Sequence, residues 1–373
     1  MTVISSFSSN DLNKIKDIDV KEIYNTQNTD KTKEILNTLN LNEKIFYFKD
    51  DVYKLIKYDK EKLKKEDFKS IGLYRSILCK NDKIVCFSPP KSLCIEDFIN
   101  SCDINRIQIE EFIDGTMINL FWSGSEWEIT TKSSLGGNVS FYIMEEGDKK
   151  EKTFRWMFLD TLNFYEEKCN EEGSNFFECV DKIPKNLCLS FVVQHPTNRI
   201  VVPHKEPSLY LTKCYEIDNN IIKEKDINIL RNKLPKWVNF PLVYDMEIEE
   251  AIQNIDLKVN DYKNMGYIIL GIDQESHAPI RTKLRNYNYE LVRKFIIQSI
   301  ELFIDIADLI NSDNNYKDQI LRSISKDDID DAYNSISKWE GYAPTPLISL
   351  NKLSKELSLK NIFYKDEDKR FDL

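Results

Sequence analysis

Hydrophobic and polar residues alternate along much of the first two thirds of the chain, with the two-residue period of half-buried strands. In residues 44–58 two such runs flank Asp50 and Asp51, which favour a turn, so we predict a hairpin. Further strands are predicted at residues 75–79, 83–87, 116–122, 126–131, 187–193, 199–202, 208–215 and 265–270. Helical spacing appears at 31–41, 153–170 and 248–255. This order predicts an antiparallel-sheet-rich α+β domain and no regular βαβ repeat.

The pattern changes at Asn288, after which apolar residues such as Leu291, Phe295 and Phe303 recur at helical spacing. We therefore predict an all-α C-terminal domain over residues 288–373. Residues 1–30 are polar and lack a period, which predicts a flexible leader. The sheet-rich domain is expected to occupy residues 31–287.

Composition narrows the class of protein. The chain has 373 residues, 41% of them hydrophobic, and can bury a substantial core. Its 52 basic and 62 acidic residues give a net charge of −10, which argues against a generally cationic nucleic-acid coat and confines any RNA contact to a local basic surface. The eight cysteines contain no CxxC pair, which disfavours zinc-finger and disulfide-framework proteins. Without a signal-like N-terminus or membrane-length apolar run, we expect an intracellular, cytoplasmic protein.

Five short segments carry the chemistry. They occur in a fixed order along the chain: Tyr74–Leu78 with Phe87–Leu93; Glu110–Trp122 followed by Trp127–Gly137; Ser190–Val202; Asn264–Ile269; and Pro279–Lys283. In this order and spacing they resemble the T4 RNA ligase 1 family, over residues 35–292. The segment His195-Pro-Thr-Asn-Arg-Ile-Val-Val is the most specific match.

The resemblance implies an antiparallel-sheet nucleotidyltransferase domain, ATP-grasp-like as in RNA and DNA ligases. In that family a lysine in the motif KxDG attacks the α-phosphate of ATP and carries AMP. Glutamates of the third and fourth motifs and two lysines of the fifth help to bind metal, ribose and phosphate.

The reacting groups implied by the family are absent. Phe112 stands at the position of the nucleophilic lysine, and an aromatic ring has no lone pair that could attack phosphorus. No lysine lies between Lys91 and Lys132, so a shifted alignment does not restore one. Val192 and Met265 replace the two glutamates, and neither offers the hard oxygen that Mg²⁺ prefers. We therefore predict no catalytic residue and no metal site; ATP or another nucleotide with Mg²⁺ is expected only if activity is retained.

The phosphate-binding groups, by contrast, are kept. The resemblance implies nucleotide or phosphate contacts for these residues: Arg75, Lys91, Asp114, Gly115, Lys132, Arg281 and Lys283. An arginine at the first position of the fifth motif keeps the charge and adds bidentate geometry. The alternative is that each cation is an ordinary surface charge.

Each motif also has a structural interpretation. Phe112, Val192 and Met265 are core residues if the ancestral site has collapsed, and wall residues if an apolar pocket stays open. Asp114 and Gly115 suit a turn.

The segment His195, Pro196, Asn198 and Arg199 is interpreted as a structural motif. In it, Arg199 braces the turn and His195 is a turn residue in preference to a catalyst.

Three functions follow. The favoured one is a non-catalytic protein that binds a nucleotide, an RNA end or a cap-like phosphate group. The second is an active ATP-dependent RNA ligase for RNA repair with a relocated nucleophile, Lys91 or Lys132. The third is a protein-interaction scaffold that contacts its partner through the C-terminal helices.

Overall fold

The computed structural model describes residues 14–15, 18–25, 27, 29–139, 153–168, 175–256, 261–290 and 292–294. The chain divides into two compact units, Met1–Asn286 and Tyr287–Leu373. All elements described below lie in the first unit. The predicted C-terminal helical domain lies almost wholly outside the described residues. The leader predicted for residues 1–30 includes two short strands and a 3₁₀ helix between Lys14 and Tyr24.

The described strands are β1 (Lys14–Ile15), β2 (Ile18–Asp19), β3 (Leu41–Phe48), β4 (Asp51–Tyr58), β5 (Ile77–Lys80), β6 (Lys83–Phe87), β7 (Gln108–Glu111), β8 (Thr116–Trp122), β9 (Trp127–Thr130), β10 (Leu187–Gln194), β11 (Ser208–Asp218), β12 (Ile221–Lys225), β13 (Val243–Tyr244), β14 (Gly266–Ile272) and β15 (Pro279–Arg285). The α-helices are α2 (Asp30–Thr38), α3 (Ile95–Ser101), α4 (Phe154–Lys168), α5 (Phe176–Asp181) and α6 (Ile248–Asp256). Short 3₁₀ helices are η1 (Lys21–Tyr24), η2 (Lys65–Asp67), η3 (Ile71–Leu73), η4 (Ile104–Arg106) and η5 (Ile227–Leu230). None of the described helices is long and apolar enough to cross a membrane.

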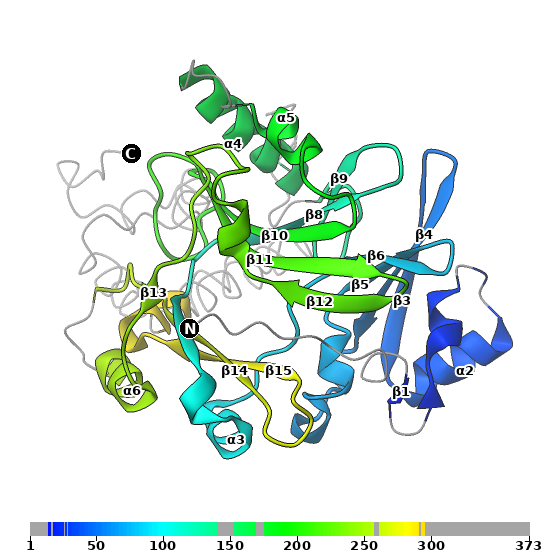
Figure 1. Ribbon diagram of the computed structural model, residues 1–373, viewed down its shortest axis with the longest axis horizontal. Helices are drawn as coiled ribbons and strands as arrows, with labels where there is room; N and C mark the ends of the chain where they lie inside the picture. Colours follow the sequence, from blue (N-terminus) through cyan, green and yellow to red (C-terminus); the bar gives the residue numbers. More distant parts are fainter. Residues whose placement is uncertain are drawn as a thin grey trace, which may run out of the picture. The chain divides into compact units, whose positions relative to one another are not determined.

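Three larger antiparallel sheets form the first unit (Figure 1), which confirms the predicted α+β class. Their strand orders are β3-β4-β5-β6, β12-β11-β10-β8-β9 and β13-β7-β14-β15. The predicted hairpin is present, with β3 and β4 paired from Leu41–Tyr58 to Phe48–Asp51. Antiparallel pairing lets β3 and β4, β5 and β6, β8 and β9, and β11 and β12 join through short turns, whereas α4 and α5 lie between β9 and β10, and α6 lies between β13 and β14.

Buried side chains lie on both faces of the five-stranded sheet. One face packs against β3–β6 through residues such as Phe87, Phe121 and Tyr215. The other is covered by α4 and α5, whose Phe158 and Phe176 contact Phe191 of β10. A third cluster joins β7, β14 and β15 to α3 and α6. Apolar burial of this extent on every sheet supplies the main stabilising term.

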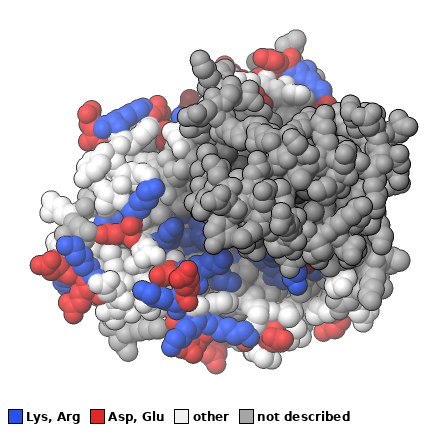
Figure 2. All heavy atoms as spheres, turned by 180° about the vertical axis from the view of Figure 1, so that it is seen from behind, with Lys and Arg blue, Asp and Glu red and all other residues white. Residues whose placement is uncertain are grey.

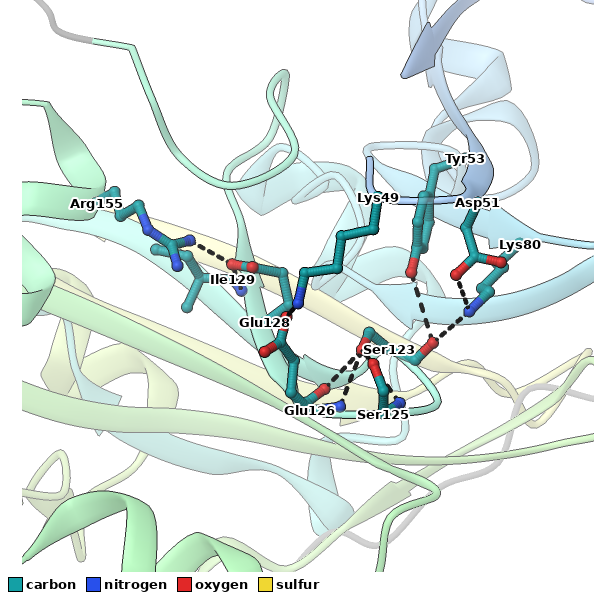
Figure 3. Close-up of polar contacts among 10 residues, drawn as sticks. All are labelled: Lys49, Asp51, Tyr53, Lys80, Ser123, Ser125, Glu126, Glu128, Ile129 and Arg155. Atoms are coloured by element: carbon teal, nitrogen blue, oxygen red, sulfur yellow. Dashed lines mark hydrogen bonds and ion pairs between the residues drawn. The ribbon is translucent and has the colours of Figure 1, made fainter. Parts of the chain in front are cut away.

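Polar contacts fix the β8–β9 turn between its neighbours (Figure 3). The ammonium group of Lys80 donates to the carbonyl of Ser123 at 2.6 Å and pairs with Asp51 at 2.6 Å. In β9, the buried carboxylate of Glu128 pairs with Arg155 of α4 and accepts the Ile129 N–H at 2.7 Å. These contacts hold the end of β9, from which the chain continues to Lys132.

The strand predicted at residues 199–202 is wrong. This segment forms bends, and the backbone N–H groups of Val201 and Val202 donate to the carboxylate of Asp114 at 3.3 and 2.9 Å. A side-chain acceptor thus takes the donors that a strand would have given to a neighbouring strand.

Candidate phosphate-binding site

Strand β15 presents three cations in a row. Its burial alternates along Pro279–Arg285, with Ile280, Thr282 and Leu284 buried, while Arg281, Lys283 and Arg285 are half-exposed. Because side chains alternate across a strand, the three cations share one face. The register that places them there is fixed by seven residue pairs with β14.

Three further cations come from distant segments. Arg75 lies between η3 and β5, Lys91 follows β6, and Lys132 follows β9. Each interacts electrostatically with others of the set, Lys283 with Arg75 and Lys91 among them. We call Arg75, Lys91, Lys132, Arg281, Lys283 and Arg285 the cation cluster. The structure therefore brings together all five cations singled out from the sequence.

Main-chain bonds place these segments. The N–H of Lys91 donates to Gly72 at 3.0 Å, and the N–H of Leu93 donates to Arg281 at 2.8 Å. The guanidinium of Arg75 donates to the carbonyl of Pro89 at 3.3 Å. On the face seen in Figure 2, lysine and arginine side chains gather around the centre, and acidic side chains lie among them toward the lower edge.

Burial and mutual repulsion depress the pKa values in the cation cluster. The pKa of Lys132 falls to about 8, first through burial and then through Arg75 and other cations. Burial, with Arg281 nearby, lowers the pKa of Arg75 to about 10. The pKa of Lys283 lies well below its usual range, because the amine is desolvated and faces Arg281, Arg75, Arg285 and Lys91. Such crowding destabilises the unliganded fold, and a bound anion would relieve it.

Aromatic rings lie beneath several of these charges. The Lys283 amine is 5.0 Å from the centre of the Phe112 ring, and the Arg285 guanidinium is 5.6 Å from it. The backbone N–H of Phe112 donates to Gly266 at 3.0 Å. Lys132 lies 5.2 Å from the Tyr58 ring. Phe112 thus contacts two cations of the cluster through its electron-rich face.

Carboxylates balance one side of the cation cluster only. Arg281 interacts with Glu110 and Glu224. Lys213 also pairs with these two groups, at 3.7 and 2.9 Å. Within the described part of the chain, no carboxylate lies within ion-pair distance of Arg75, Lys91, Lys132 or Lys283. Their charge is therefore available for an external anion.

The residues do not fit a Mg²⁺ site. In the described ranges no three His, Cys, Asp or Glu side chains are grouped so that they could hold a metal ion. The carboxylate of Glu110 accepts from Gln108 at 2.6 Å and pairs with Lys213. Val192 and Met265 are both half-exposed, as is Phe112, so none of the three belongs to the buried core. This favours a partly open wall over a collapsed site.

Asp114 and Gly115 have structural partners. The buried Asp114 carboxylate holds Val201 and Val202, and its carbonyl accepts from Gln194 at 2.9 Å. Gly115 has φ +151°, and an added Cβ would lie 2.6 Å from the Val193 oxygen. These contacts favour the turn interpretation over a direct phosphate contact, which stays a prediction.

The segment around His195 is held by protein contacts. The imidazole pairs with Asp160 at 3.0 Å and with the Thr197 hydroxyl at 2.8 Å, and Asn198 donates to Thr116 at 2.8 Å. Arg199 donates to the carbonyl of Val201 at 3.0 Å, and Pro196 is exposed between these anchored residues. The contacts support a structural role for this motif.

Sequence reasoning missed Arg285 and Tyr58 as members of the site. The alternation Arg281, Lys283, Arg285 was the available signal for the first, because a strand places every second residue on one face. Tyr58 is buried, and desolvation raises its pKa while Arg75 and Arg281 lower it. Nothing in the local sequence distinguishes Tyr58 from other strand tyrosines.

Comparison with protein families gives no matching family model, and no curated protein matches the sequence. Solved structures of RNA ligases show a loose likeness. An archaeal ATP-dependent RNA ligase, form 1, is 12% identical, with TM-score 0.45, over 87% of this chain and 79% of that chain. Form 2 of the archaeal ligase is 13% identical, with TM-score 0.40, over 70% of this chain and 63% of that chain. A mutant RNA ligase from Naegleria gruberi with ATP and Mn is 11% identical, with TM-score 0.36, over 54% of this chain and 54% of that chain. At these scores no residue role is transferred, and function is argued from this chain's own residues.

Proposed function

We propose that this chain is an RNA ligase-like protein of the nucleotidyltransferase fold that binds the phosphate of a nucleotide, an RNA end or a cap-like group without transferring a nucleotide through residue 112. The cation cluster carries the proposal. Four of its members, Arg75, Lys91, Lys132 and Lys283, have no carboxylate within ion-pair distance among the described residues. Burial, followed by repulsion from neighbouring cations, lowers their pKa values. Phosphate oxygens are the acceptors that such a group of amines and guanidinium groups recognises.

Binding is tested with a 5′-phosphorylated single-stranded RNA oligonucleotide. Lys132→Ala and Lys283→Ala are each expected to weaken binding and to lower the slope of log affinity against log salt by ~0.7 per lost phosphate contact. Lys223→Ala removes the same charge from an exposed position on β12 and should change little. Equal affinity and equal salt slope in all four proteins would remove the proposal.

Covalent nucleotide transfer is tested with α-labelled ATP and Mg²⁺, followed by denaturing electrophoresis. No label is expected on the protein, since Phe112 cannot form a phosphoramide. Label retained on any lysine would replace the binding function with an active, relocated nucleophile. If the protein bound no nucleotide, pyrophosphate or RNA, the remaining candidate function would be a protein-interaction scaffold.

A further inference from the structure

Lys283 differs from Lys213, a buried lysine of the same region. Lys213 lies on β11 with two carboxylates, at 2.9 Å from Glu224 and 3.7 Å from Glu110, and is an ion-paired ammonium group. Lys283 has neither an ion pair nor a hydrogen-bond acceptor among the described residues. Its amine rests over the Phe112 ring at 5.0 Å and faces the charges of Arg75, Lys91, Arg281 and Arg285.

These surroundings disfavour the ammonium form. Desolvation removes the hydration that stabilises a charged amine, and nearby cations repel the proton. The low pKa of Lys283 follows from both causes, in that order. Lowering the pKa of a lysine raises the fraction of its amine that is unprotonated and therefore nucleophilic. An exposed or ion-paired lysine stays almost wholly protonated.

The residues around the amine define which electrophile reaches it. Arg75, Lys91 and Arg281 would hold a phosphate group, and the Phe112 ring offers an apolar surface beside it. A phosphate dianion carries about two negative charges against four nearby positive ones, so its binding weakens the repulsion on the amine without reversing it. The half-exposed Lys283 side chain remains reachable from solvent.

We propose that Lys283 captures an aldehyde or ketone that carries a phosphate group, such as a phosphorylated sugar in its open-chain form, as a Schiff base. The amine nitrogen attacks the carbonyl carbon, a C–N bond forms, and the carbonyl oxygen takes up a proton. The nitrogen gives up both of its protons in all, and these leave with the former carbonyl oxygen as one water, so that a C=N bond replaces the C=O bond. No oxidant, reductant or metal is required. The capture rests on the proposed phosphate binding and adds a covalent step to it.

Pyridoxal 5′-phosphate is a probe that combines an aldehyde with a phosphate. The full chain is treated with it at pH 7, the imine is reduced with borohydride, and the modified lysines are located by peptide mass spectrometry. Lys283 should be the main site, with Lys213 unmodified. Pyridoxal, which lacks the phosphate, should react at least about tenfold more slowly, and inorganic pyrophosphate should protect Lys283.

Lys283→Arg keeps the positive charge but forms no stable imine. It should lose the adduct, and its thermal unfolding curve should match that of the wild-type protein. Wild-type protein that binds pyrophosphate but carries its adducts on other lysines would overturn the capture and leave phosphate binding intact. Equal labelling of Lys283 by both aldehydes, without pyrophosphate binding, would overturn phosphate recognition and leave the reactive amine.

Discussion

Lys132 gives the site a pH dependence that can be measured directly. Its pKa of about 8 means that the side chain is charged at pH 7 and largely neutral at pH 9. Affinity for a 5′-phosphorylated oligonucleotide should therefore fall by up to about tenfold over this interval, since each 1.4 kcal/mol of lost attraction is tenfold in affinity. Titrations at pH 7, 8 and 9 test this.

Lys132→Arg is the matched control, because arginine stays charged throughout. The variant should keep most of its affinity at pH 9. A wild-type affinity that is flat from pH 7 to 9 would show that the charge of Lys132 does not act on the ligand.

Stability should follow pH in the opposite direction. The folded protein binds fewer protons at Lys132 than the unfolded chain between its folded pKa of about 8 and the ordinary lysine value of 10.5. The free energy of unfolding of the ligand-free protein should therefore rise with pH over this window. Lys91 and Lys283 have lowered pKa values and contribute with the same sign. Denaturant unfolding at pH 8 and 10 measures the change, and Lys132→Met should reduce it.

Asp114 separates a structural from a binding role at a single residue. Replacement by alanine leaves the N–H groups of Val201 and Val202 without this acceptor, so we expect a loss of about 1–3 kcal/mol in the free energy of unfolding. Affinity for phosphorylated RNA should stay within about twofold of wild type, which is a much smaller change than the loss of one charged contact would cause. A variant of normal stability with lost affinity would assign Asp114 to the ligand. Asp114→Asn, which keeps one acceptor oxygen, should be milder.

At the scale of elements, Gly266 controls how β14 meets its neighbours. It has φ +121°, and an added Cβ would overlap the carbonyl oxygen of Leu284 in β15. Gly266→Ala should therefore destabilise the protein. We expect about 1–3 kcal/mol from the strained backbone conformation and about 1–3 kcal/mol more from the steric overlap. Because Gly266 also accepts from the Phe112 N–H, phosphate affinity should fall as well.

Gly124 is the matched control for backbone conformation. Its φ is +109°, but an added Cβ would approach only the flexible Lys80 amine, at 3.3 Å. Gly124→Ala should show the conformational cost without the overlap. Chemical denaturation of both variants compares them, and equal losses would mean that the contact with Leu284 is relieved by small shifts.

Sequence patterns gave the strands that alternate cleanly and missed those whose exposed face is charged. β15 begins at Pro279 and carries Arg281, Lys283 and Arg285, so its pattern resembles a solvated loop. β7 has two glutamates, of which the buried Glu110 pairs with Lys213 from another sheet. Such partners lie far away in sequence and are invisible to local periodicity.

The candidate site was predictable in its members and not in its chemistry. Motif positions indicated five of the six cations, and alternation could have supplied Arg285. The low pKa of Lys283 depends on Arg75 and Lys91, which approach it only in the folded chain. Likewise, the choice between a collapsed and an open site needed the exposure of Phe112, Val192 and Met265.

For the whole molecule, the cation cluster exists only after distant segments have met. Its members span residues 75 to 285, so a ligand that binds them binds the native state and not the unfolded chain. Phosphorylated RNA at 100 times its dissociation constant should stabilise the protein by about 2.7 kcal/mol. Thermal unfolding at several ligand concentrations should show a rising midpoint temperature. The single variants Lys132→Ala and Lys283→Ala should each require more ligand for the same rise in midpoint temperature. An unchanged midpoint at saturation would contradict specific binding to the native state.

The hydrogen bonds between Leu93 and β15 bear on self-association of the protein. β15 is the edge of its four-stranded sheet, and an uncovered edge is a template on which a second chain can add a strand. The Leu93 N–H binds the Arg281 carbonyl, and the Thr282 hydroxyl donates to the Leu93 carbonyl at 3.0 Å. The segment thus covers the middle of this edge, while the like charges of Arg281, Lys283 and Arg285 repel a second copy of the same strand. The cations of β15 therefore also protect the protein from edge-to-edge aggregation.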